Sequence, residues 1–228
     1  MKKHFFFLAT LLGTSLAFGQ TSLKPFNAVS LHGCMKVEMV QGAQESFTIE
    51  GDSHETSQVK VEVSKGELSI KKSWKNDVWN KQGCNCEKVR IRLTFRSVEG
   101  IKTGWGAQVN VVSALKENEL KIDASSGSEI SLESQTNHLD LIASSGAVVK
   151  ISGKSQSMFV KSTTGGEISA YNLDCQDVEA KANTGGSARI TAQTSIEASA
   201  GTGGEIRFKG RPKQWSFSRS LGGEINSY

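Results

Sequence analysis

The carboxylates of the second half of the chain are the first candidates for chemistry, because paired acids at a fixed separation can act as general acid and base. Asp123 and Asp140 do not match, since one stands four residues before the next repeat glycine and the other stands six before it. Asp174 and Asp177 flank a cysteine in a stretch where acidic residues commonly serve turns. The hydroxyls of Ser125–Ser126 have no positioned histidine partner that could activate a nucleophile. We therefore predict no catalytic residues and a protein that is not an enzyme.

The cysteines could form disulfides or hold a metal ion. Cys84 and Cys86 are separated by one residue, which is too close for a comfortable bridge between them. Each could pair with Cys34 or Cys175, or one pair could form while two thiols remain. A zinc site would use Cys or His pairs at regular spacing, whereas the histidines beyond the leader are scattered, at positions 32, 54 and 138. We expect structural cysteines, no metal site and no cofactor.

The segment Lys71–Lys88 is the most irregular part of the chain, and it contains Trp74, Trp79 and both close cysteines. Loops on rigid scaffolds commonly carry binding function, and exposed tryptophans offer flat apolar faces that suit sugar rings or partner surfaces. The two tryptophans are therefore ligand-contact candidates. The alternative is that they fold back and cap the protein.

A glycine-centred phrase recurs along the second half of the chain. Its aligned glycines are separated by 19, 19, 20, 18 and 19 residues. A period this steady is typical of stacked repeat proteins, in which each unit buries its apolar edge against its neighbours. The repeat glycines are Gly127, Gly146, Gly165, Gly185, Gly203 and Gly222.

Apolar and polar residues alternate on both sides of each repeat glycine, as in Leu139 and Leu141 before Gly146 and Val149 and Ile151 after it. This period of two is the strand period. Such short strands are unlike propeller blades, and the units lack the helix of a leucine-rich repeat. The sequence predicts an all-β fold, a single-stranded parallel and right-handed β-helix with coils of about 19 residues. Its glycines would form a column of corners where positive φ is cheap.

The glutamates two positions after the glycines, among them Glu205 and Glu224, alternate with the apolar columns and should face outward. Glu205 and Glu224 would be like-charge neighbours on adjacent coils, and Arg207 and Arg189 could approach Glu205 diagonally and offset the repulsion. We interpret these carboxylates as a solvated face.

The first half of the mature chain also alternates, with less regularity, and Trp105-Gly106-Ala107 looks like a weak first copy of the repeat phrase. We predict one domain over residues 20–228, in which a less regular β part at 20–100 leads directly into regular repeats at 101–228.

The first 19 residues predict a signal peptide, because Lys2-Lys3 precede an apolar stretch and Ala17-Phe18-Gly19 supplies small residues before a cut near Gly19–Gln20. No later segment is apolar over the 18 or more residues that a membrane span needs. Without Lys2 and Lys3 the chain has 25 basic and 23 acidic residues, a balance that predicts no nucleic-acid partner. We expect an exported protein that is periplasmic, associated with the outer surface or extracellular.

The order of several phrases resembles the bacterial family called putative auto-transporter adhesin, head GIN domain. The phrases are 26–33 (FNAVSLHG), 37–42 (VEMVQG), 49–52 (IEGD) and 66–70 (GELSI), followed by the glycine repeats, so the resemblance covers about residues 24 to 228. It implies a β-helical, secreted or envelope-associated protein of Bacteroidetes-like bacteria with a proposed adhesive role and no catalytic motif. The chain ends at Tyr228 without the translocator barrel of a true autotransporter, so we expect separate machinery for any passage across an outer membrane.

Two classes of function follow from these patterns. The first is an adhesin or binding module for a glycan or for an envelope or host protein. The second is a structural or assembly component of the envelope that has no free ligand. A polysaccharide-active enzyme is the third and weakest hypothesis, and the sequence indicates no oligomeric state.

Overall fold

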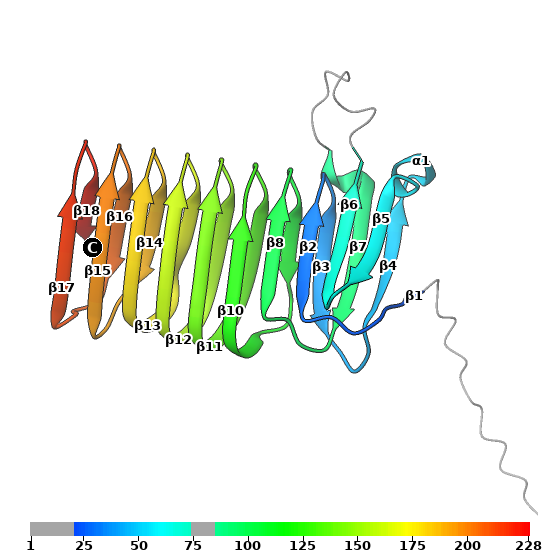
Figure 1. Cartoon of the computed structure of the whole chain (residues 1–228), viewed down its shortest axis with the longest axis horizontal. Helices are drawn as coiled ribbons and strands as arrows, with labels where there is room; N and C mark the ends of the chain where they lie inside the picture. The colour runs from blue at the N-terminus through cyan, green and yellow to red at the C-terminus, as the bar shows by residue number, and fades with distance from the viewer. Residues whose placement is uncertain (1–20, 74–84) are drawn as a thin grey trace, which may run out of the picture.

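The computed structural model describes residues 21–73 and 85–228, and these residues wind into a β-solenoid with its strands stacked along one long axis (Figure 1). Equivalent residues of neighbouring regular coils lie side by side, such as Ile130 beside Val149 and Leu139 beside Met158, each pair 19 positions apart. The predicted parallel β-helix with coils of about 19 residues is confirmed, whereas its hand stays a prediction.

Each coil contributes one strand to a front sheet and one to a back sheet, named by their places in Figure 1. In stacking order the front sheet contains β5 (Val59–Ser64), β6 (Glu67–Lys72), β2 (Ala28–His32), β8 (Gly100–Gly104), β10 (Leu115–Ala124), the second halves of β11 (Glu129–Ser144), β12 (Val148–Thr163) and β13 (Glu167–Asn183), β15 (Ser195–Gly201) and β17 (Gln214–Arg219). The back sheet contains β4 (Ser46–Gly51), β7 (Val89–Phe95), β3 (Lys36–Gln41), β9 (Gln108–Val111), the first halves of β11 to β13, β14 (Ser187–Thr191), β16 (Glu205–Lys209) and β18 (Glu224–Ser227).

The interior is built from columns of apolar side chains, because alternate residues of every strand point inward. One back-sheet column contains Ile130, Val149, Ile168, Ala188, Ile206 and Ile225, and each of these side chains is at most 4% exposed. Burial of apolar area in continuous columns is the main stabilising term of such a stack.

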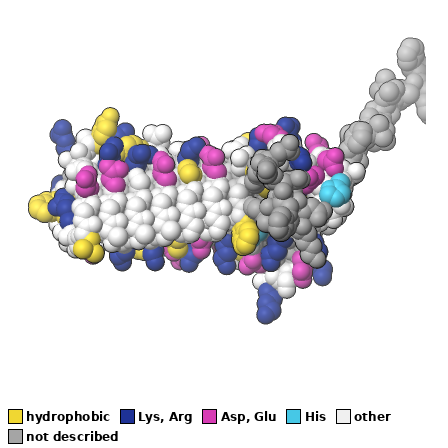
Figure 2. Space-filling model, turned by 90° about the horizontal axis from the view of Figure 1, so that it is seen from above, with side chains coloured by type: hydrophobic (Ala, Val, Ile, Leu, Met, Phe, Trp, Pro, Cys, Tyr) yellow, Lys and Arg dark blue, Asp and Glu magenta, His cyan; other side chains and the backbone are white. Residues whose placement is uncertain are grey.

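The tight corners that join the front sheet to the back sheet use two residues with positive φ. The repeat glycines have φ between +68° and +76°, and the residue before each, from Ser126 to Leu221, has φ between +46° and +52°. Trp105 (φ +59°) and Gly106 (φ +77°) have similar values, in agreement with the prediction that Trp105-Gly106-Ala107 is a first copy of the repeat phrase. Seen from above, the corners form a white band between two charged faces (Figure 2).

A second glycine follows the first in four coils, and its role is steric. At Gly166, Gly186, Gly204 and Gly223 an added Cβ would lie 2.1 to 2.4 Å from a carbonyl oxygen of the preceding coil. Nothing lies within 4 Å of a Cβ added at the repeat glycines themselves. The first glycine is therefore favoured by its backbone angle and the second by the close approach of the neighbouring coil.

The N-terminal coils are not stacked in chain order. Strand β2 lies between β6 and β8, and β3 lies between β7 and β9, so the first coil of the chain is the second parallel coil of the stack. Strands β4 and β5 then cover β7 and β6 in antiparallel orientation, and β1 (Thr21–Ser22) pairs with β4. The sequence did not predict this order, because hydrophobic alternation does not encode which coils are neighbours.

A short helix, α1 (Ser53–Thr56), and a buried ion pair complete this N-terminal cap. The Asp52 side chain accepts hydrogen bonds from the first backbone N–H groups of α1. Glu55 of α1 approaches Lys72 Nζ at 2.8 Å and Lys88 Nζ at 3.2 Å, and the Lys72 side chain is only 3% exposed. The irregular segment predicted from Lys71 therefore begins later, since Lys71 and Lys72 are the last residues of β6.

The opposite end of the solenoid leaves its last coil open. Within the described chain, β17 pairs only with β15 and β18 only with β16. Trp215, in register with the buried Ile196, is 67% exposed and stacks on Phe217 with ring centroids 5.3 Å apart. Arg219 donates a hydrogen bond to the Ile225 carbonyl at 2.8 Å, so a cation occupies part of the edge where a further strand would pair.

Candidate functional site

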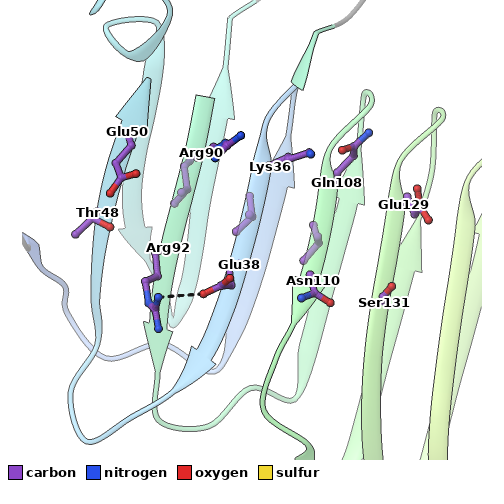
Figure 3. A pocket seen from close by; sticks show the side chains of 13 residues that line it. Lys36, Glu38, Thr48, Glu50, Arg90, Arg92, Gln108, Asn110, Glu129 and Ser131 are labelled. Atoms are coloured by element: carbon purple, nitrogen blue, oxygen red, sulfur yellow. Dashed lines mark ion pairs between the residues drawn. The ribbon is translucent and has the colours of Figure 1, made fainter. Parts of the chain in front are cut away.

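A shallow groove of about 680 Å³ crosses the outer face of the back sheet near its N-terminal end (Figure 3). It runs across β4, β7, β3, β9 and β11, which are adjacent in the stack although far apart in the sequence. The side chains come in two rows because each strand offers two outward positions, and the rungs are about 4.8 Å apart. The rows are Glu50, Arg90, Lys36, Gln108 and Glu129, and Thr48, Arg92, Glu38, Asn110 and Ser131.

The cations of the groove are neutralised by neighbouring carboxylates. Arg92 pairs with Glu38 at 3.2 Å, as the dashed line in Figure 3 shows. Glu87, on the short 3₁₀ helix η1 (Cys86–Lys88), binds Lys36 and also Arg90, the latter at 2.8 Å. The hydrogen bond from Lys36, and then that from Arg90, lowers the pKa of Glu87. A net anionic ligand would therefore have to displace existing pairs.

A second set of polar side chains in the groove has unused hydrogen-bonding capacity. Within the described residues, Gln108, Asn110, Thr48, Ser131 and Glu50 form no side-chain hydrogen bond or ion pair. Amides, hydroxyls and a carboxylate together offer both donors and acceptors. The arrangement can bind hydroxyl-rich or peptide-like surfaces without requiring a strong charge.

The outward-facing glutamates that stand two positions after the repeat glycines continue along the same face, and we call this row the glutamate ladder. Its ion pairs differ in part from those predicted from the sequence. Arg207 pairs with Glu205 at 2.6 Å, as expected, but Arg189 pairs with Glu167 instead of Glu205. Glu129 at the groove edge pairs with Lys150 at 2.6 Å, and this hydrogen bond raises the pKa of Lys150. These exposed pairs contribute little to stability, so the ladder serves mainly as a solvated face.

The groove is not among the sites that the sequence predicted. Trp74 and Trp79 lie outside the described residues, so their role stays a prediction. The repeat glycines Gly127, Gly146, Gly165, Gly185, Gly203 and Gly222 form the corner column described above and line no part of the groove. Sequence reasoning missed the groove because it identified outward positions without knowing which strands would be adjacent.

The cysteines divide into a close group and a separate thiol. The sulfur atoms of Cys34 and Cys86 lie 3.0 Å apart, and Cys84 is outside the described residues. A disulfide of Cys34 with either close cysteine stays a prediction. Cys175 is a free thiol on β13 that approaches the Asp177 carbonyl at 3.3 Å, so the structure does not contain the alternative in which it is bridged. Burial raises the pKa of the Cys175 thiol to about 12, so this side chain is unreactive near neutral pH.

One histidine does meet a serine and an aspartate on the front sheet. His138 Nδ1 lies 2.9 Å from Ser157 Oγ, and Nε2 lies 3.1 Å from Asp140 Oδ1. Ser157 Oγ also lies 3.2 Å from the Asn137 carbonyl, so its single proton has two acceptors within reach, that carbonyl and His138 Nδ1. The His138 side chain is 49% exposed, so we describe the set as a hydrogen-bonded row on the surface of the front sheet.

The comparisons with known proteins agree with this geometry. A family model described as "Putative auto-transporter adhesin, head GIN domain" matches residues 25–212. A comparison with curated proteins found no match.

Several crystal structures share the fold. A putative adhesin of Bacteroides fragilis NCTC 9343 superposes with a TM-score of 0.81 at 22% identity, covering 92% of this chain and 95% of that one. A putative lipid binding protein of Parabacteroides distasonis ATCC 8503 gives 0.71 at 18% identity, covering 92% and 95%. A putative adhesin of Parabacteroides merdae ATCC 43184 gives 0.68 at 18% identity, covering 92% and 94%. At these identities the likeness shows the fold alone.

Proposed function

Because the chain belongs to the family described as putative auto-transporter adhesin, head GIN domain, we propose that it is a non-catalytic adhesin that binds a glycan or protein surface. The proposal rests on one observation, the set of uncommitted polar side chains in the back-sheet groove. They are held on rigid strands at a regular spacing, so little conformational entropy is lost on binding. The whole groove lining is charge-balanced, with Lys36, Arg90 and Arg92 against Glu38, Glu50 and Glu129, and this balance fits a hydroxyl-rich or peptide ligand.

We further propose that the protein works outside the cytoplasm, at the periplasmic side of the envelope, at the cell surface or in the medium. The family description and the leader sequence support this location. The described part of the chain contains no helix that is long and apolar enough to span a membrane.

The groove is tested by replacing its two amides. Gln108→Ala with Asn110→Ala should weaken binding to a glycan array or to envelope extracts at least tenfold, because two bidentate groups are lost, and should leave the melting temperature nearly unchanged. Asn226→Ala is the matched control, since Asn226 occupies the same outward row on β18, beyond the groove. Binding that survives in the double variant would refute the groove as the site. If the unaltered protein binds no glycan and no extract saturably, a structural role in the envelope would be favoured.

The tryptophans of the segment Lys71–Lys88 need their own test. If Trp74 and Trp79 contact a ligand, Trp74→Ala with Trp79→Ala should abolish binding while the melting temperature stays nearly unchanged. If they cap the protein instead, the same change should lower stability by a few kcal/mol, as truncation of packed aromatics does. Binding and stability that both persist would contradict both roles.

A further inference from the structure

The C-terminal end of the solenoid presents the edge of β17 to solvent, at the end of the stack away from the N-terminal cap (Figure 1). Ser220 N donates a hydrogen bond to the Ala200 carbonyl of the preceding coil. Successive residues of a strand direct their N–H and C=O groups to opposite edges, so those of Trp215, Phe217 and Arg219 point away from β15. Within the described chain no strand pairs with this edge.

The apolar interior also reaches this end without being covered. Trp215 and Phe217 are in register with Ile196 and Ala198 of the buried columns, so they occupy inward positions of the last coil. The Phe217 ring lies 5.3 Å from the Trp215 ring and 5.5 Å from the Phe208 ring, measured between centroids. Trp215 is nevertheless 67% exposed. The end of the interior is therefore an aromatic surface that a further strand would cover.

A purely structural explanation accounts for only part of this edge. Arg219 is in register with the buried Ala200, and an inward-pointing charge on an edge strand discourages pairing with other strands. This explains Arg219. It does not explain Trp215, which enlarges the exposed apolar area of the same edge. Together the two residues favour a strand that offers an aromatic ring to the cation and a cation to the ring.

A second β17 is such a strand. In an antiparallel pair centred on Phe217, Trp215 of each copy lies opposite the partner's Arg219. Directly opposed residues have Cβ atoms about 4.5 to 5.5 Å apart, which lets a guanidinium lie over an indole face. All three residues direct their N–H and C=O groups to the free edge, so the register that matches the side chains also matches the backbone hydrogen bonds.

The back sheet fits the same two-fold axis. Phe217 and Ser227 stand five residues before and five residues after Gly222, so they lie at about the same level of the last coil. Tyr228 N donates to the Phe208 carbonyl of the preceding coil, and Ser227 therefore directs its own N–H and C=O groups to the free edge of β18. Two copies of β18 can meet at Ser227 when two copies of β17 meet at Phe217.

Opposite charges lie at matching distances from this axis. Ser227 is in register with Phe208, Glu224 stands three residues before Ser227, and Arg211 stands three residues after Phe208. A two-fold axis at this level would bring Arg211 of each copy beside the partner's Glu224. Both side chains are exposed, and within the described residues neither forms an ion pair.

We propose that the protein forms an end-to-end dimer, in which the occupant of the open end is β17 and β18 of a second copy of the chain. The interface uses the same patch on both copies, so it closes at two and does not propagate into a fibre. Both back sheets then face one side, with the two grooves at the outer ends of the dimer. Bivalent binding to one surface would follow. That consequence rests on the proposed function, whereas the dimer itself does not.

Sedimentation equilibrium of the purified protein over a range of concentrations should give a single monomer–dimer equilibrium. Trp215→Ala is expected to raise the dissociation constant of the dimer at least tenfold, because a central aromatic contact is lost twice. Val112→Ala is the matched control, since Val112 is an exposed apolar residue, 58% exposed, just after β9 in the other half of the solenoid. It should dimerise like the unaltered protein.

A pair of charge variants tests the geometry itself. Trp215→Lys places a lysine opposite the partner's Arg219, and Arg219→Glu removes the cation from the indole, so each variant alone should dimerise at least tenfold more weakly. An equimolar mixture should restore a dimer that contains one chain of each kind, because one lysine–glutamate pair and one Trp215–Arg219 contact form. Native mass spectrometry separates this mixed dimer from the others by mass. Lys116→Glu, an exposed charge reversal on β10, should dimerise like the unaltered protein.

Several results would overturn the proposal. They are a protein that stays monomeric at every concentration, dimerisation that survives Trp215→Ala, a mixture that fails to restore the dimer, and assemblies that grow beyond two copies. A monomer that binds phosphatidylglycerol vesicles through Trp215 would show that a lipid surface covers the open end instead. Failure of glycan binding with an intact dimer would count against the groove alone.

Discussion

Replacing Ile168 by aspartate is expected to destabilise the protein by roughly 4 kcal/mol or more, because it places an unpaired carboxylate in an apolar column. The Ile168 side chain is fully buried between Val149 and Ala188 of the adjacent coils. No cation lies in that column to pair with the new charge. Urea denaturation followed by circular dichroism would show a large drop in the transition midpoint.

The adjacent residue provides the control for this substitution. Ser169 points outward between Lys150 and Arg189 of the neighbouring coils. Ser169→Asp should therefore be neutral or slightly stabilising, since the new carboxylate meets two cations. Equal losses of stability in the two variants would mean that the inward and outward positions have been assigned incorrectly.

Removing the charge of Glu55 is expected to be the second large effect, with a loss of about 3 kcal/mol in Glu55→Gln. The change removes the Glu55 carboxylate from the buried Lys72 ammonium, and it loosens α1 from the end of the stack. Removing both charges, as in Glu55→Leu with Lys72→Met, should cost much less, because the buried ammonium is removed together with the Glu55 carboxylate. Glu62→Gln, at an exposed position of β5, is the matched control. Thermal denaturation of the variants would check this order, and a double variant worse than Glu55→Gln would contradict it.

The same ion pair predicts a dependence of stability on acid. Hydrogen bonding to Lys72 holds the pKa of Glu55 below its ordinary value of 4.5. A carboxyl whose folded pKa is depressed stabilises the protein above the unfolded pKa, and that contribution is lost as the pH falls through the folded value. The unaltered protein should therefore lose more stability below pH 4.5 than Glu55→Gln does, and parallel curves of melting temperature against pH would argue against this assignment.

The regular half of the solenoid could be predicted from the sequence because its signals are local. Alternation around Gly146 and Gly165 placed Val149 and Ile168 inward, and the structure pairs these two residues directly. The corner conformation followed from the glycines, although the positive φ of the preceding residue did not. That residue is Ser, Thr, Leu or Trp, and none of these types signals such a backbone by itself.

The N-terminal cap and the back-sheet groove could not be predicted, because they depend on the stacking order. Lys36 and Arg90 form one row of the groove only because β3 lies against β7, 54 positions away in the sequence. Lys60 and Lys71 face each other because β5 runs antiparallel to β6. Lys72 reads as part of a polar basic segment, and its burial became visible only with Glu55 beside it.

Because the first coil of the chain lies inside the stack, truncation should have different effects at the two ends of the solenoid. A chain shortened from its C-terminal end would lose coils singly, and each loss would leave the preceding coil as the new end. Removal of β2 and β3 would instead take a layer from inside the stack and leave β6 and β7 separated from β8 and β9. During synthesis, likewise, the first strands have no neighbouring coil to join until β6 and β7 are complete at residue 95, whereas every later coil can wind onto a finished one.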